Sequence, residues 1–333
     1  MGNTPFRALA EVLDKTRPVL VQAHDFPDHD AIASAYALCE LLLRAGYTAD
    51  MTFAGEIQSI SLSIMMDRLS IQHLPFDEAL ELPGAQSIVV DGSPFDGTVR
   101  RAAGELVAVI DHHPVTGTPV CPLVDIRPDT GSCSSIIWTY WLDSGEEADR
   151  TTATALIAGI QLDTDFLSRH VSKTDLDAHY ELFFMGNYEL AREVVRTTLK
   201  LDQVRAIGKA FTSSLALGST LLVELKEDYS SELLSVLADF LLRLQEITFV
   251  VAVEIRGEEY HLSARSKDCA LDAGSIIRAA LDGIGTGGGH RHMAGGIITP
   301  AKYPGSKLLL ERITRELDIY RSVHEADSKT CGT

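Results

Sequence analysis

Long apolar runs are missing from this sequence. No stretch approaches the ~20 consecutive apolar residues that a bilayer-spanning helix needs. The first residues, MGNTPFRALAEVLDK, form an amphipathic pattern without the apolar core of a signal peptide. We therefore expect a cytoplasmic protein with no membrane partner.

Paired cysteines are also missing. The five cysteines (Cys39, Cys121, Cys133, Cys269 and Cys331) are scattered, odd in number and never spaced C-x-x-C. A disulfide framework or a thiolate zinc site is therefore not expected, which fits a reducing compartment.

Basic charge is scarce. The chain has 29 Lys and Arg against 47 Asp and Glu, and its formal net charge is −18. A protein that binds long duplex nucleic acid normally presents a basic surface to many phosphates. Long duplexes are therefore not expected as partners, and an anionic substrate must be small and held locally.

The length of 333 residues, with 45% hydrophobic residues, is enough for two domains with separate cores. From about residue 18 to 170 short β-rich runs alternate with helical patterns, which predicts an α/β domain whose parallel sheet has helices on both faces. Strand patterns return at 219–226, 247–257 and 259–267, and predict a smaller α/β domain. We place the domains at 1–190 and 216–322, with a helical linker at 191–215 and a flexible tail at 323–333.

Four polar clusters follow the predicted strands and helices of the first domain. They are His24, Asp28 and Asp30; Asp91; Asp111, His112 and His113; and Asp163. Ligands of parallel sheets bind beyond the carboxyl ends of the strands, where these clusters fall. Mixed carboxylate and imidazole groups suit Mn²⁺, Mg²⁺, Fe²⁺ or Zn²⁺, and this number of groups is what two neighbouring cations need.

Several nearby residues have simpler interpretations. An isolated aspartate at a helix or turn end is usually a cap, which is what we expect of Asp25 and Asp165. His29 is expected at an exposed, variable position rather than as a ligand. Trp138 and Trp141 lie three residues apart on an apolar helix and are expected in the core.

The glycine-rich stretch 285–296 contains Gly287, Gly288, Gly289 and His290. Glycine runs are often simple turns, but backbone N–H groups without side-chain cover can approach a phosphate closely. The neighbouring basic residues favour that interpretation.

These motifs resemble those of the DHH phosphoesterase family, with its C-terminal DHH-associated domain. HDFPDHDAIAS (24–34) matches the first motif except that Ala33 replaces glycine. The later motifs are matched by VVDGS, VIDHHP, GIQLDT (159–164) and GGGHRHMAG (287–295), the last with Met293 in place of alanine. The resemblance covers about residues 15 to 318.

The resemblance implies roles for individual residues. His24 and Asp28 would bind one metal ion, Asp30, His112 and Asp163 the other, and Asp91 would bridge them. The two cations, with Mn²⁺ as first choice, would activate a water molecule. Asp111 would orient the imidazoles, and His113 would contact the scissile phosphate. Ser263, Arg265 and the Gly287–His290 segment would bind the substrate.

Within this family the chain is most similar to stand-alone nanoRNase/pAp phosphatase (NrnA-like) proteins, because it shows neither an oligonucleotide-binding barrel nor transmembrane segments. This implies hydrolysis of short oligoribonucleotides to mononucleotides, with pAp and pApA as further substrates, and leaves room for a homodimer. Two alternatives stay open. One is a phosphatase of short polyphosphate, and the other is a non-catalytic metal or nucleotide sensor.

Overall fold

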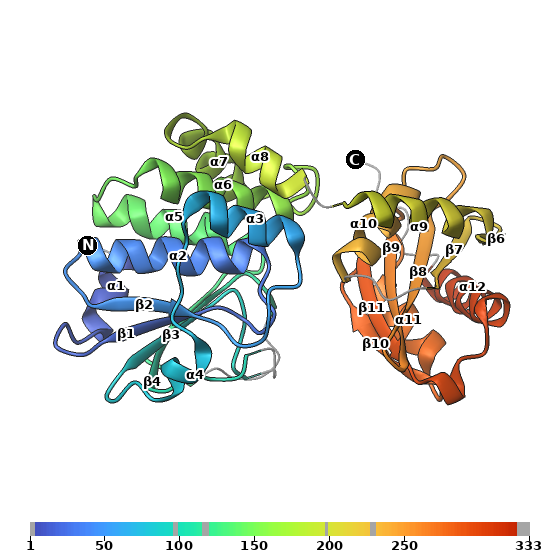
Figure 1. Ribbon diagram of the computed structural model, residues 1–333, viewed down its shortest axis with the longest axis horizontal. Coiled ribbons are helices and arrows are strands. Elements are labelled where there is room, and N and C mark those ends of the chain that lie inside the picture. Colours follow the sequence, from blue (N-terminus) through green and yellow to red (C-terminus); the bar gives the residue numbers. More distant parts are fainter. Residues whose placement is uncertain (1–3, 96–98, 115–119, 197–198, 227–230, 325–333) are drawn as a thin grey trace. The chain divides into compact units, whose positions relative to one another are not determined.

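The computed structural model describes residues 4–95, 99–114, 120–196, 199–226 and 231–324 (Figure 1). The chain divides into two compact units, Met1–Thr197 and Thr198–Thr333. The segment predicted as a linker is shared between helix α8 (Tyr188–Arg196) of the first unit and helix α9 (Leu201–Thr212) of the second. Of the predicted tail, residues 323–324 end helix α12 (Ser306–His324), and the rest lies outside the described residues.

The first unit is built on a five-stranded parallel sheet in the order β2-β1-β3-β4-β5. Its strands are β1 (Val19–Gln22), β2 (Ala49–Thr52), β3 (Gln86–Val90), β4 (Glu105–Asp111) and β5 (Leu123–Ile126). The β1 and β3 strands are buried along their whole length, which explains their nearly continuous apolar sequences. The strand order reverses between β1 and β3, and this is the point of such a sheet where ligands bind.

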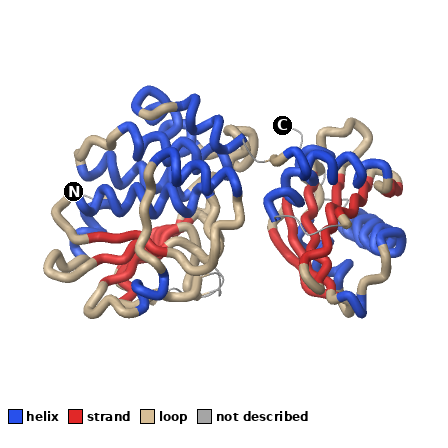
Figure 2. Tube along the Cα trace, viewed as in Figure 1, coloured by secondary structure: helices blue, strands red, loops and turns tan. Residues whose placement is uncertain are grey.

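Helices cover both faces of this sheet, as predicted, but unevenly (Figure 2). Val19 and Val21 of β1 contribute to the larger core on one face, while Leu20 packs with helix α4 (Phe76–Leu80) on the other. The larger core also takes residues from α1 (Pro5–Val12), α2 (His29–Arg44), α3 (Ile60–Leu69), α5 (Cys133–Ser144), α6 (Arg150–Asp163), α7 (Lys173–Met185) and α8. Trp138 and Trp141 are buried in it, which confirms their predicted structural role.

The second unit has a six-stranded sheet in the order β10-β11-β9-β8-β7-β6. Its strands are β6 (Leu215–Leu217), β7 (Thr220–Leu225), β8 (Phe249–Arg256), β9 (Glu259–Ser266), β10 (Gly285–Gly289) and β11 (Met293–Ile298). Helix α10 (Ser231–Leu241) lies between β7 and β8 in the sequence, and these two strands pair in parallel. The other neighbouring strands pair antiparallel. The α9 and α10 helices contribute to one core, and α11 (Ala273–Leu281) and α12 to the other. A 3₁₀ turn, Pro300–Lys302, precedes α12. This confirms the smaller α/β domain.

The glycine-rich stretch forms the hairpin β10–β11 rather than a loop. A Cβ atom at Gly287 would lie 2.8 Å from Ile277 Cγ2, and one at Gly296 would lie 2.4 Å from Leu281 Cδ1. Both contacts are with α11, so these glycines let the helix pack closely on the hairpin. Close packing thus accounts for part of a pattern that the sequence alone suggests is phosphate binding.

None of the described helices combines the length and the apolar character that crossing a membrane requires.

Candidate metal centre

The loop after β1 and the start of α2 carry three of the predicted ligands. Asp28 is the N-cap of α2, and its Oδ1 accepts hydrogen bonds from the backbone N–H groups of Asp30 (2.9 Å) and Ala31 (3.1 Å). His24 precedes it in the loop, and Asp30 lies in the first helical turn. The capping interaction is typical of aspartate at this position.

Asp91 directly follows β3 and is 2% exposed. Its φ is +53°, in the left-handed region that residues with a Cβ seldom adopt. Its N–H donates to Ile110 O at 3.0 Å, which anchors this turn to β4. Backbone strain of this kind concentrates at functional sites.

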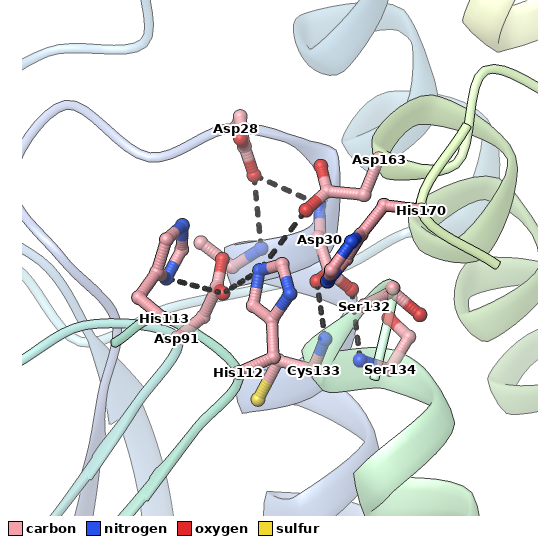
Figure 3. Close-up of polar contacts among 12 residues, drawn as sticks. Asp28, Asp30, Asp91, His112, His113, Ser132, Cys133, Ser134, Asp163 and His170 are labelled. Atoms are coloured by element: carbon pink, nitrogen blue, oxygen red, sulfur yellow. Dashed lines mark hydrogen bonds and ion pairs between the residues drawn. The ribbon is translucent and has the colours of Figure 1, made fainter. Parts of the chain in front are cut away.

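Asp111, His112 and His113 lie at the end of β4, and Asp163 lies at the end of α6. The Nε2 atom of His112 is 3.1 Å from Asp163 Oδ2 and 3.4 Å from Asp91 Oδ1, while His24 Nε2 is 3.9 Å from Asp91 Oδ2. Figure 3 shows Asp28, Asp91, His112 and Asp163 gathered around one space. Residues from four separate segments therefore meet at the carboxyl edge of the sheet.

The side chains form three overlapping groups. Within each group, the atoms that could bind a metal ion lie within 4.8 Å of one another. The groups are His24, Asp28 and Asp91; Asp30, His112 and Asp163; and Asp91, His112 and His113. All six predicted metal ligands thus lie close together. Asp91 shares one group with His24 and Asp28 and another with His112 and His113, and His112 links it to the group of Asp30 and Asp163.

The donor chemistry fits two divalent cations. Two ligands at about 2 Å from the same ion lie roughly 3 to 4 Å apart, as the His112–Asp163 and His112–Asp91 atoms do. Within the described part of the chain, Asp91 Oδ1 and His112 Nε2 are buried atoms without a hydrogen-bond partner. Buried polar atoms are costly unless satisfied, and a cation would satisfy both.

The electrostatics of the cluster also favour cations. Burial raises the pKa of Asp163 to about 6, with Asp28 and Asp91 adding to the effect and His112 opposing it. Burial lowers the pKa of His112, but the carboxylates of Asp163 and Asp91 outweigh it and raise the value to about 12. Burial and the neighbouring carboxylates also hold the pKa of Asp30 well above its usual range. Crowded carboxylates of this kind become stable as anions when cations lie between them.

Asp30 also has a structural task. Its two carboxylate oxygens accept hydrogen bonds from the backbone N–H groups of Cys133 (2.6 Å) and Ser134 (2.8 Å), at the start of α5 (Figure 3). Gly159 on α6 makes room for this carboxylate, because a Cβ atom there would lie 2.8 Å from Asp30 Oδ1. The glycine of the fourth motif therefore has a steric function beside the cluster.

Asp111 contacts His113 and not His112. Its Oδ1 accepts from the backbone N–H of His113 at 3.0 Å and lies 2.9 Å from His113 Nδ1. The Nδ1 atom of His112 instead lies 3.2 Å from the backbone oxygen of Thr130. A histidine that binds metal through Nε2 needs such an acceptor for its other nitrogen.

Two further residues of this region differ from what the sequence indicates: the role of Asp175 was not predicted, and His29 was predicted to be exposed. Asp175 is fully buried and accepts hydrogen bonds from Gly131 N (2.8 Å) and from Ser172, which fixes the turn that follows Thr130. His29, expected to be exposed, is 1% exposed, and burial lowers its pKa to about 4. His29 lies on the side of α2 that packs into the unit, and the polar residues around it in the sequence do not indicate this burial.

Four of the six predicted substrate-binding residues line one pocket of about 330 Å³ in the second unit. These are Ser263, Arg265, Gly289 and His290, and Arg256 and His261 join them. Asp239 and the Ser263 hydroxyl hold the Arg265 guanidinium at 2.8 and 2.9 Å.

The other two predicted residues do not line this pocket. Gly287 packs against α11, and a Cβ atom at Gly288 would lie 3.1 Å from Arg278 Nη2. Of the pocket residues, Arg256 and His261 are absent from the sequence prediction, because neither belongs to a recognisable motif.

Comparisons with known proteins agree with the division of the chain into two units. The DHH family, N-terminal domain, matches residues 18–160, and the DHHA1 domain matches residues 218–316. An uncharacterized protein of Methanocaldococcus jannaschii is 31% identical over 282 residues, which is 84% of this chain and 58% of that protein. A probable manganese-dependent inorganic pyrophosphatase of Streptococcus mutans is 28% identical over 149 residues, or 44% of this chain and 48% of that protein. The chain spans about half the length of these two curated relatives.

Two solved structures share the fold. An exopolyphosphatase-related protein from Bacteroides fragilis superposes with a TM-score of 0.77 at 17% identity, over 96% of this chain and 97% of that chain. RecJ from Thermus thermophilus, in complex with Mn²⁺, superposes with a TM-score of 0.55 at 14% identity, over 96% of this chain and 54% of that chain. At these identities the likeness concerns the fold alone.

Proposed function

The chain belongs to the DHH family, and we propose that it is a metal-dependent phosphoesterase that hydrolyses short oligoribonucleotides to mononucleotides, with pAp and pApA as further substrates. The observation that carries this proposal is a pair of neighbouring side-chain groups, one of His24, Asp28 and Asp91 and the other of Asp30, His112 and Asp163. They are joined where His112 Nε2 lies 3.4 Å from Asp91 Oδ1. Two cations held side by side suit the in-line displacement at phosphorus that hydrolysis of a phosphoester requires.

We assign His24 and Asp28 to one cation, Asp30, His112 and Asp163 to the other, and Asp91 to both. Mn²⁺ is our first choice because streptococcal relatives are named as probable manganese-dependent pyrophosphatases, with Mg²⁺ and other divalent ions as alternatives. When bound, the cations would lower the pKa of a water molecule and neutralise charge on the phosphoryl oxygens.

We assign His113 to the scissile phosphate and Asp111 to the orientation of His113. Burial lowers the pKa of His113, but the Asp111 hydrogen bond and the Asp91 charge raise it above its usual value. The neighbouring carboxylates thus stabilise the protonated ring, and in that form His113 can donate a hydrogen bond to a phosphoryl oxygen. The side chain is 42% exposed, so a substrate can reach it.

We assign the pocket of the second unit to the substrate, with Arg265, Ser263 and His290 as its polar contacts. Its volume of about 330 Å³ is at the lower end for small-molecule sites. That size and the net charge of −18 both favour a short nucleotide over a long nucleic acid. A cytoplasmic location and a homodimer stay predictions.

A second candidate is a phosphatase of short polyphosphate. It is favoured by relatives named as inorganic pyrophosphatases, whose match covers 44% of this chain. The main proposal also gives a role to the second unit, which matches the DHHA1 domain at residues 218–316.

A substrate panel tests the two candidates. We would measure Mn²⁺-dependent hydrolysis of 5′-labelled oligoribonucleotides of increasing length, pAp, pApA and tripolyphosphate by the wild type and Asp91→Ala. Fastest mononucleotide release from the shortest oligomers, abolished by the substitution, is the expected result. Hydrolysis of tripolyphosphate alone would reject the nucleotide assignment and favour the second candidate.

A further inference from the structure

Phe26 lies in the loop that carries the first cation's proposed ligands, two residues after His24 and two before Asp28. Its side chain is 55% exposed, although phenylalanine is among the most apolar residues. Its backbone has φ +54°, in the left-handed region that is unfavourable for a bulky residue. An exposed ring on a strained backbone needs a reason beyond packing.

The surrounding loops support the ring. The Phe26 N–H donates to Ala54 O at 3.0 Å, in the segment that follows β2. The ring covers Gly55, where a Cβ atom would lie 2.8 Å from ring atoms Cδ1 and Cε1. Gly55 itself has φ +80°, so glycine is required there twice over. The preceding residue, Asp25, also anchors this loop, because its Oδ1 accepts a hydrogen bond from Arg100 N at 2.9 Å.

Burial does not explain this arrangement. Phe26 belongs to none of the hydrophobic clusters found among the described residues, whereas Phe6 and Phe166 of the same unit pack against the larger core. One side of the ring rests on the Gly55 backbone, and more than half of the side chain stays open to solvent. The geometry is that of a supported flat apolar surface.

We propose that Phe26 is a stacking platform for a nucleobase of the substrate, beside the group formed by His24, Asp28 and Asp91. This inference rests on the proposed function and adds a residue that determines substrate class. Consecutive Cα atoms are 3.8 Å apart, so the Phe26 Cα lies within about 7.6 Å of the Cα atoms of both neighbouring ligands. A nucleoside attached to a phosphate at those ligands can reach the ring.

Stacking on an aromatic ring is tolerant of base identity, because every base has a π face. The platform therefore favours nucleotides in general over inorganic phosphate chains, which have no group to stack. It gives the first unit a means of telling a nucleotide from polyphosphate that the metal ligands alone do not supply.

The test compares Phe26→Leu with Phe26→Trp in the full-length, Mn²⁺-loaded protein. Leucine keeps apolar bulk but removes the aromatic face, and tryptophan keeps the face. Phe184→Leu is the matched control, because Phe184 is 72% exposed on α7. The substrates are pApA, two pApA analogues that each lack one base, and tripolyphosphate. Equal metal content and melting temperature would show that each variant is folded.

We expect Phe26→Leu to raise the KM for pApA roughly tenfold, the effect of losing one stacked base, with a smaller change in kcat. Phe26→Trp should restore the wild-type KM, and Phe184→Leu should not change it. On the analogue that lacks the stacked base, Phe26→Leu and wild type should have equal KM values.

Two results would overturn the platform while leaving the proposed function intact. One is hydrolysis of pApA with the same KM by wild type and Phe26→Leu. The other is an equal rise in KM on pApA and on both analogues, which would indicate a general distortion of the loop. A wild type that cleaves tripolyphosphate but no nucleotide would refute the proposed function, and the platform with it.

Discussion

Replacing Gly159 by alanine tests whether the packing of α6 against α2 sets the position of Asp30. The new Cβ atom would lie 2.2 Å from Ser134 Oγ, 2.8 Å from Asp30 Oδ1 and 3.1 Å from Asp30 Cα. The serine hydroxyl can rotate away, but the aspartate cannot. Its two oxygens are held by the N–H groups of Cys133 and Ser134, and its Cα is part of α2.

Asp30 or α6 must therefore move by roughly 0.4 to 0.7 Å to restore an ordinary contact of about 3.5 Å. Overpacking of this size costs about 1 to 3 kcal/mol, and misaligned hydrogen bonds to a charged group add to that cost. Alanine offsets up to about 1 kcal/mol through its higher helix propensity. We expect a net loss of about 2 kcal/mol, or a fall of roughly 4 to 8 °C in melting temperature for a domain of this size.

The assay is thermal unfolding followed by circular dichroism, with Mn²⁺ affinity measured by calorimetry. The transition of the first unit is the one that Mn²⁺ shifts upward. Gly208→Ala in α9 is the matched control, because a Cβ atom there would meet nothing within 4 Å and the helix should gain up to about 1 kcal/mol. A Gly159→Ala protein as stable as wild type, with unchanged Mn²⁺ affinity, would refute the argument.

Three further predictions concern the same unit. Removing metal with a chelator should lower its melting temperature, and excess Mn²⁺ at 100 times its Kd should restore about 2.7 kcal/mol. Asp175→Asn should weaken Mn²⁺ binding by roughly 10- to 100-fold, since the turn that holds the Thr130 carbonyl against His112 loses its anchor; calorimetry measures this. His113→Asn should lower kcat by roughly 10²-fold or more with two Mn²⁺ still bound, because a donor to the phosphate is lost; steady-state kinetics and metal analysis measure this together.

Each of these has a result that contradicts it. An unchanged melting temperature after complete metal removal would count against a structural cluster of cation ligands. Asp149→Ala removes the N-cap of α6 and is the control for Asp175→Asn, so equal effects of the two on Mn²⁺ affinity would exclude a positioning role. For His113→Asn, loss of one Mn²⁺ would indicate a ligand instead of a phosphate contact.

The clustering of these acidic and histidine side chains follows from the sequence, because they come after elements that a parallel sheet brings to one edge. Asp91 ends the run SIVVD and Asp111 ends LVAVID, so strand periodicity alone places both carboxylates together. The parallel sheet of the first unit and the gathering of all six side chains could be predicted for the same reason. The smaller α/β unit could be predicted from its own strand patterns, but its hairpin β10–β11 could not.

Other parts could not be predicted, because they depend on contacts between distant residues. Asp175 fixes a turn 44 residues earlier in the chain, and in the sequence it is one of many aspartates near a helix start. Gly287 reads as a phosphate-binding glycine, yet its neighbours are side chains of α11. His29 lies between two ligands, and only the packing of α2 decides that it is buried.

The most direct test of the two-cation site is the number of Mn²⁺ ions bound by wild type and by Asp91→Ala, together with their magnetic coupling. We would measure occupancy by equilibrium dialysis and metal analysis, and coupling by electron paramagnetic resonance. Two ions per chain with an exchange-coupled signal, replaced in Asp91→Ala by fewer ions and an uncoupled signal, is the predicted result. A single uncoupled Mn²⁺ in the wild type would contradict a site in which Asp91 bridges two cations.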